Sequence, residues 1–65
     1  MDERLFNGCG DTREAATVAA CEKAEAAMVE AGGKLRQWRI TGGREINGKW
    51  MITVGYKWTV RKARA

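Results

Sequence analysis

Hydrophobic and polar residues follow two different periods along this chain of 65 residues. Between residues 12 and 31, small apolar side chains recur at the spacing of a helix, and at 100° per residue they share one side of it. That side comprises Ala16, Ala20, Cys21, Ala24, Ala27, Met28 and Ala31, and the other side comprises Glu14, Glu22, Lys23, Glu25 and Glu30. The pattern predicts an alanine-rich amphipathic helix, which small side chains should allow to lie close to its packing partner.

Local signals mark both ends of this helix. Asp11 can accept hydrogen bonds from the amides of the first turn, and Glu14 can reach back to it in a capping box. Gly32 and Gly33 supply the stop, because glycine readily adopts the left-handed conformation that ends helices. We therefore expect the helix within residues 11–32.

After the two glycines the period changes from 3.6 to 2, which is typical of β-strands. Asn47-Gly48 lies between two β-prone runs and predicts a hairpin over residues 34–61 with a type I′ turn. The expected pairs are Ile46 with Lys49, Glu45 with Trp50, Gln37 with Trp58 and Leu35 with Val60. Gly42-Gly43 and Gly55 interrupt the pattern and indicate a bulge or a strong bend, which would shift the pairing beyond it.

This register divides the hairpin into two faces. The expected core face carries Leu35, Trp50, Ile52, Val54, Tyr56, Trp58 and Val60. The opposite face carries Arg36, Trp38, Ile40, Arg44, Ile46, Lys49, Met51, Thr53, Lys57 and Thr59. One helix can cover only one face, so the second face should remain exposed, and exposed apolar area of this kind marks an interaction site.

Together these elements predict a single domain of the α+β class over residues 1–65, with one alanine-rich helix packed on a long antiparallel hairpin. Residues 4–7 are a candidate for a short N-terminal third strand, with residues 7–10 as the turn into the helix. Residues 62–65 form a basic tail.

Charge is divided unevenly within the net charge of +4. Residues 1–33 carry three basic and seven acidic residues, whereas residues 34–65 carry nine basic residues and a single acid, Glu45. Such a division favours either an anionic partner for the basic half or subunits that pair acid against base. We therefore expect a homo-oligomer as well as an anionic ligand.

The candidate ligand-binding residues lie in the basic half. They are Arg36, Trp38, Arg44, Lys49 and Lys57 on the hairpin, and Arg61, Lys62 and Arg64 in the tail. An aromatic ring that stacks on a base, flanked by cations that contact phosphates, is the combination used by proteins that bind single-stranded nucleic acid. Nucleic acid is the first hypothesis. Two alternatives remain open: an acidic protein surface, as for phage-type small inhibitors of nucleic-acid-handling enzymes, and burial of the Trp38 face against another subunit.

Catalytic and metal-binding chemistry has little support in this sequence. The chain contains no histidine and no serine, so the usual catalytic triads cannot be assembled, and we expect a non-enzymatic protein without a metal or cofactor. Cys9 and Cys21 do not have the spacing of paired zinc ligands. No apolar stretch resembles a signal peptide or a membrane span, so we expect reduced cysteines and a cytoplasmic location.

A third hypothesis comes from a family resemblance. The stretches GREINGK (residues 43–49) and ITVGY (residues 52–56), together with a strand, an alanine-rich helix and a long hairpin, are similar to the dodecins. Dodecins are small flavin-binding proteins that assemble into hollow shells, and the resemblance implies that Trp38 stacks on the isoalloxazine ring. The chain departs from that pattern in a shorter first strand, a shorter hairpin and the lack of a glutamine on the second hairpin strand.

Overall fold

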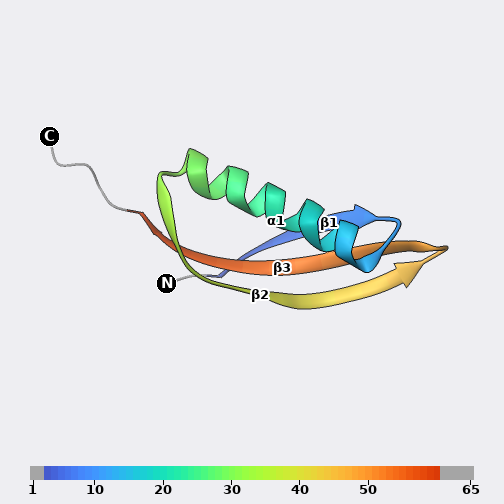
Figure 1. Ribbon diagram of the computed structural model, residues 1–65. Coiled ribbons are helices and arrows are strands. Elements are labelled where there is room, and N and C mark those ends of the chain that lie inside the picture. The colour runs from blue at the N-terminus through green and yellow to red at the C-terminus, as the bar shows by residue number, and fades with distance from the viewer. Residues whose placement is uncertain (1–2, 61–65) are drawn as a thin grey trace, which may run out of the picture.

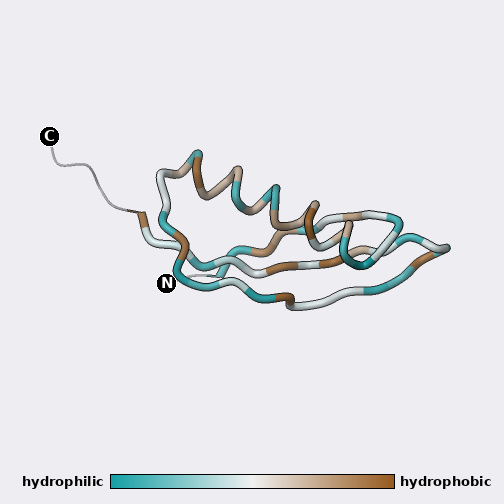
Figure 2. The backbone as a smooth tube through the Cα atoms, in the orientation of Figure 1, coloured by the Kyte–Doolittle hydropathy of each residue, from teal (hydrophilic) through white to brown (hydrophobic). Residues whose placement is uncertain are grey.

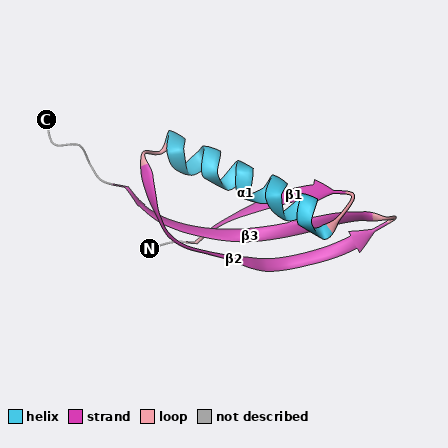
Figure 3. Cartoon of the chain, viewed as in Figure 1, coloured by secondary structure: helices cyan, strands magenta, loops and turns pink. Residues whose placement is uncertain are grey.

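The computed structural model describes residues 3–60, which form one helix and one sheet. In chain order the elements are β1 (Arg4–Gly10), α1 (Arg13–Glu30), β2 (Gly33–Ile46) and β3 (Lys49–Val60). The three strands form an antiparallel sheet in the order β1-β3-β2, and α1 lies on one face of it (Figures 1 and 3). The predicted α+β fold is confirmed, including the N-terminal third strand.

The core lies between α1 and the central strand β3. It consists of Ala16, Ala20 and Ala24 from the helix and of Ile52, Val54, Tyr56 and Trp58 from the strand. Figure 2 shows the apolar stretch of β3 lying along α1. Gly8 on β1 also lets α1 lie close to the sheet. The backbone of Ala16 and Ala20 occupies the space that a Cβ at Gly8 would need. The close approach predicted from the small helical side chains is therefore confirmed.

Strand β1 is longer than the sequence suggested. Its seven residues pair with β3 along their whole length, from Arg4 opposite Tyr56 to Gly10 opposite Trp50. Residues 7–10 therefore continue the strand, and the expected turn at these residues is wrong. The reason is packing, because Gly8 and Gly10 face α1, and an added Cβ at Gly10 would meet the backbone of Ala16.

The first turn of α1 is capped one residue later than expected. Thr12 is the N-cap residue, and its hydroxyl oxygen accepts a hydrogen bond from the Ala15 amide at 3.0 Å. The predicted cap at Asp11 is wrong, since the hydroxyl of Thr12 occupies the position from which a cap bonds the third helical amide. The glycine stop is confirmed, because Gly32 has a φ of 69° directly after the helix.

The hairpin turn matches its prediction. Asn47 and Gly48 have φ angles of 50° and 79°, and a type I′ turn requires positive values at both residues. Ile46 pairs with Lys49, and Glu45 pairs with Trp50, as expected.

Two β-bulges shift the register farther from the turn. The first lies between Ile40 and Gly42, and the second lies between Leu35 and Gln37, so Thr41 and Arg36 have no direct partner on β3. The glycine pair predicted the first bulge but not the second. As a result Gln37 pairs with Lys57 and Leu35 pairs with Trp58, and the expected pairs of Gln37 with Trp58 and of Leu35 with Val60 are wrong.

The first bulge also moves Trp38 and Ile40 to the other face of the sheet. Trp38 pairs with Tyr56 and Ile40 pairs with Val54, and residues paired directly across antiparallel strands share a face. Trp38 and Ile40 therefore lie on the α1 side, not among the cations as expected, and the Trp38 and Tyr56 rings are 6.0 Å apart between centroids.

Strand β2 nevertheless remains largely uncovered. It forms one edge of the sheet, and every residue of it except Gly33 is exposed. Leu35 and Val60, expected in the core, are 40% and 53% exposed. The molecule is elongated, with Cα extents of 51 × 17 × 12 Å, and the hairpin turn projects beyond α1 (Figure 1).

Candidate nucleic-acid interface

The face of the sheet opposite α1 carries most of the sheet's cations. We call it the open face, because no described element packs on it (Figure 1). Strand alternation and the observed register assign it Leu5, Asn7 and Cys9 from β1, Lys34, Gln37, Arg39, Arg44 and Ile46 from β2, and Lys49, Met51, Thr53, Lys57 and Thr59 from β3. Its cations are thus Lys34, Arg39, Arg44, Lys49 and Lys57.

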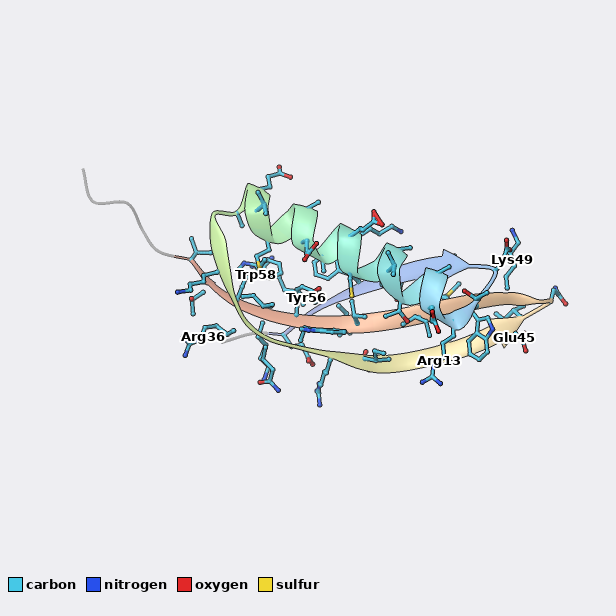
Figure 4. All side chains as sticks on the ribbon, in the orientation of Figure 1. Arg13, Arg36, Glu45, Lys49, Tyr56 and Trp58 are labelled. Carbon is cyan, nitrogen blue, oxygen red and sulfur yellow. The ribbon has the colours of Figure 1, made fainter. Side chains whose placement is uncertain are left out.

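The structure brings together three of the residues predicted from the sequence. Arg44, Lys49 and Lys57 share the open face. Arg36 lies in the second bulge, is exposed and extends from β2 away from α1 (Figure 4). Trp38 lies on the α1 face, and the predicted tail residues Arg61, Lys62 and Arg64 lie outside the described residues.

Sequence reasoning missed two cations of the open face, Lys34 and Arg39. Lys34 is opposite Thr59, and Arg39 is opposite Gly55. Without the bulge at Thr41, alternation along β2 places Arg39 on the core side. The glycine pair beside Thr41 was the available signal for this shift, but it does not say which residue is displaced.

The cations extend along most of the hairpin. Lys49 and Lys57 are eight residues apart on β3, which corresponds to about 26 Å at 3.3 Å per residue. The face rotates over this length because β-strands twist. The open face is therefore a twisted basic ribbon.

One cation of the ribbon has an ionic partner. The Arg39 guanidinium donates from Nε to Glu3 Oε2 at 2.8 Å and from a terminal nitrogen to Glu3 Oε1 at 3.1 Å. The hydrogen bond from Arg39 lowers the pKa of the Glu3 carboxyl below its ordinary value of 4.5, and the same bond raises the pKa of Arg39. Within the described residues, this is the one ion pair, so Lys34, Arg44, Lys49 and Lys57 carry unpaired charges there.

Gly55 makes room for this ion pair. The Glu3 carboxylate occupies the space that a Cβ at Gly55 would need, so the pair crosses the central strand directly above its backbone. It links the segment before β1 to β2 across β3.

Two further hydrogen bonds tie the strands together on this side. The Thr53 hydroxyl donates to Asn7 Oδ1 at 2.6 Å, and the Thr41 hydroxyl donates to the Thr53 carbonyl at 3.3 Å. Thr41 is the displaced residue of the first bulge. These bonds link all three strands near the middle of the open face and favour a fixed arrangement of its cations.

Acidic residues are concentrated on the opposite layer of the molecule. Helix α1 carries Glu14, Glu22, Glu25 and Glu30. Glu45, the acid on β2, is opposite Trp50 and therefore lies on the α1 face. The two layers thus differ in the sign of their charge, with the basic one formed by the sheet.

The α1 face of β2 offers a different kind of surface. Ile40, Arg13, Glu14, Thr17 and Val18 line an open groove of about 460 Å³ between β2 and α1. Trp38 is 45% exposed on this same face of the sheet. Trp38 is thus separated from the open-face cations by the thickness of the sheet.

The described residues hold little reactive chemistry. Within residues 3–60, no three His, Cys, Asp or Glu side chains are grouped as a metal site, and α1 is not long and apolar enough to cross a membrane. Cys9 is exposed and Cys21 is half-buried, and neither forms a disulfide. Burial raises the pKa of Tyr56, and the neighbouring Cys21 side chain raises it further.

Comparisons with models of protein families, with curated proteins and with solved structures find no match to the chain. What the site can do therefore follows from its own residues. Four unpaired cations on an uncovered, hydrogen-bonded sheet can bind an extended anion.

Proposed function

We propose that the protein is a small, non-enzymatic module that binds nucleic acid through its open face. The observation that carries this proposal is the row of four cations, Lys34, Arg44, Lys49 and Lys57, without described ion-pair partners on a face that no element covers. Contacts of Lys and Arg with phosphates release condensed counterions, which drives binding that is independent of sequence.

The composition of the open face favours a phosphate backbone over a protein interface that is anchored by aromatic side chains. Hot spots of protein interfaces are enriched in tryptophan, tyrosine and arginine, and they cluster in well-packed, desolvated pockets. The open face has no aromatic side chain among its described residues. Its four unpaired cations instead extend from Lys49 to Lys34, which is opposite Thr59, over about 33 Å, which corresponds to about ten nucleotides at 3.4 Å each.

Base stacking has a smaller part in this proposal than the sequence suggested. A ligand on the open face does not reach Trp38, because the indole lies on the α1 side of the sheet. Only a nucleic-acid strand that passes around the β2 edge, where Arg36 is exposed, would contact both Trp38 and the open-face cations. The open-face contacts serve single-stranded and duplex nucleic acid alike.

Fluorescence anisotropy with labelled 12-nucleotide single strands and duplexes tests the proposal. Four phosphates neutralised by the open face predict a slope of log affinity against log salt of about −2.8 for single strands and about −3.6 for duplexes. The affinity should be nearly independent of base sequence. Absence of binding at about 50 mM salt, where electrostatic attraction is strong, would refute the proposal.

The flavin and acidic-protein hypotheses are tested in parallel. Tight binding of free flavin, detected by quenching of tryptophan emission, without binding of oligonucleotides would favour the dodecin-like hypothesis. Binding to an acidic protein or to polyglutamate, again without oligonucleotide binding, would favour a protein partner.

A further inference from the structure

A second charged surface lies on the outside of α1. Glu14, Val18, Glu22, Glu25 and Val29 recur at intervals of three and four residues, so they share one side of the helix. We call this side the acidic stripe. It is opposite the buried residues Ala16, Ala20 and Ala24, and all five of its side chains are exposed. Val18 and Val29 are 56% and 71% exposed, although both are aliphatic.

The open face has the complementary composition. Its cations are accompanied by Leu5, Ile46 and Met51, which are 62%, 48% and 40% exposed. Each surface thus combines unpaired charge of one sign with aliphatic side chains that the monomer leaves in water. Burying those side chains and pairing those charges are both favourable on association.

We propose that the acidic stripe of one copy docks on the open face of a second copy of this chain. Glu14, Glu22 and Glu25 then face the open-face cations, and the two valines contact its aliphatic side chains. The stripe fits the open face in length, because Glu14 to Val29 extend about 22 Å along α1, and Lys49 and Lys57 are about 26 Å apart. The arrangement also gives the sheet a helix on its second face, as in other layered α and β folds.

Two other ways of joining two copies are less favourable. Contact between two open faces brings like charges together, which costs several kcal/mol. Pairing of two β2 edges is opposed by the bulges at Arg36 and Thr41 and by the cations along the strand, since both features protect sheet edges.

Docking of helix on sheet is a head-to-tail contact, which does not close within a dimer. An open assembly therefore has a free acidic stripe at one end and a free open face at the other, and only closure into a ring uses both. The average mass in solution should therefore rise with protein concentration above the 7.2 kDa of one copy and fall with salt.

Charge reversal of each surface tests this arrangement. Variant one is Glu22→Lys with Glu25→Lys, and variant two is Arg44→Glu with Lys57→Glu. In light scattering and sedimentation at about 50 mM salt, each variant alone should associate at least about tenfold more weakly than the native chain. An equimolar mixture should associate again, because the stripe of variant two is intact and so is the open face of variant one.

Recovery in the mixture shows that both variants are folded, and circular dichroism checks each one separately. Lys23→Glu, which changes a charge of α1 outside the acidic stripe, should leave association within about twofold of native. A native chain that stays monomeric at about 1 mM would overturn the proposal. It would also be overturned if both folded variants retained native association, or if their mixture failed to associate.

This inference does not rest on nucleic-acid binding, and the same variants separate the two ideas. Variant one keeps the open face and should bind oligonucleotides at least as well as the native chain. If the mixture associates but no protein binds oligonucleotides, the self-association stands and the proposed function fails. If variant one binds oligonucleotides and the native chain is monomeric, the proposed function stands and the self-association fails.

Discussion

Gly8 and Gly55 show how single residues set the arrangement of this small protein. The missing side chain of Gly8 lets α1 contact the backbone of β1, and the missing side chain of Gly55 lets Glu3 reach Arg39. One glycine thereby brings the helix close to the sheet, and the other places an acid among the open-face cations. Neither role can be predicted from the local sequence, because each depends on a contact between segments that are distant along the chain.

Gly8→Ala should destabilise the fold strongly. The added Cβ would collide with the backbone of Ala16 and Ala20, which cannot move without displacing α1. Overpacking of this kind costs about 1–3 kcal/mol or more of unfolding free energy. Urea denaturation measures it, and Gly42→Ala is the matched control, since a Cβ at Gly42 meets nothing within 4 Å. Equal stability of the two variants would show that α1 does not contact β1 as described.

Glu3→Gln should increase affinity for oligonucleotides. The substitution removes the carboxylate that pairs with Arg39 and leaves a fifth unpaired cation on the open face. Salt titration of binding should become steeper by roughly one unit. Glu45→Gln changes the net charge equally but on the α1 face, so its slope should stay native. If both variants steepen the slope equally, net charge matters and the position of Arg39 does not.

The ion pair also predicts a dependence of stability on pH. Because the pKa of Glu3 is lower in the folded chain than its ordinary value of 4.5, the pair stabilises the fold above pH 4.5. This contribution is lost as the pH falls from 4.5 through the lowered pKa. The difference in melting temperature between native and Glu3→Gln chains should therefore be present at pH 7 and shrink in that acidic window. A difference independent of pH would mean that the charge of Glu3 has no part in it.

Among the elements, those set by local signals could be predicted from the sequence, and those set by contacts between distant segments could not. The helix, its glycine stop and the Asn47-Gly48 turn depend on local signals, and the sequence predicted them correctly. The length of β1 depends on packing of Gly8 against α1, and the bulge at Arg36 depends on pairing with β3. No local pattern contains either contact.

The bulges had the largest consequence for the candidate site. They moved Trp38 away from the cations and brought Arg39 to the open face. Arg44 lies on the turn side of both bulges, and Lys49 and Lys57 lie on β3, where no residue is displaced, so all three kept their predicted face. The basic character of the site was therefore predictable, whereas its aromatic component was not.

Trp38→Ala tests the position of the ligand relative to β2. If the ligand binds the open face, the substitution should leave oligonucleotide affinity within about twofold at every salt concentration. Loss of one base stacked on an aromatic ring would instead cost about 1–3 kcal/mol. Such a loss would place the ligand around the β2 edge, in contact with both faces. Circular dichroism provides the control for folding, since Trp38 contacts Tyr56 of the core.

At the scale of the whole molecule, the two layers of the fold carry opposite charge. The helix layer presents the acidic stripe, and the sheet layer presents Lys34, Arg44, Lys49 and Lys57. Both proposed interactions use the open face, so nucleic acid and the acidic stripe of another copy exclude each other there. Oligonucleotides should accordingly lower the mass of protein assemblies as they bind.

The most direct test compares two variants that lose the same charge from opposite layers. Arg44→Ala with Lys57→Ala removes two open-face cations, and Arg13→Ala with Lys23→Ala removes two from α1. If nucleic acid binds at the open face, the first pair should flatten the slope of log oligonucleotide affinity against log salt by about 1.5 units, and the second pair should change it by less than about 0.5. Equal flattening by both pairs, or none by the first, would contradict binding at the open face.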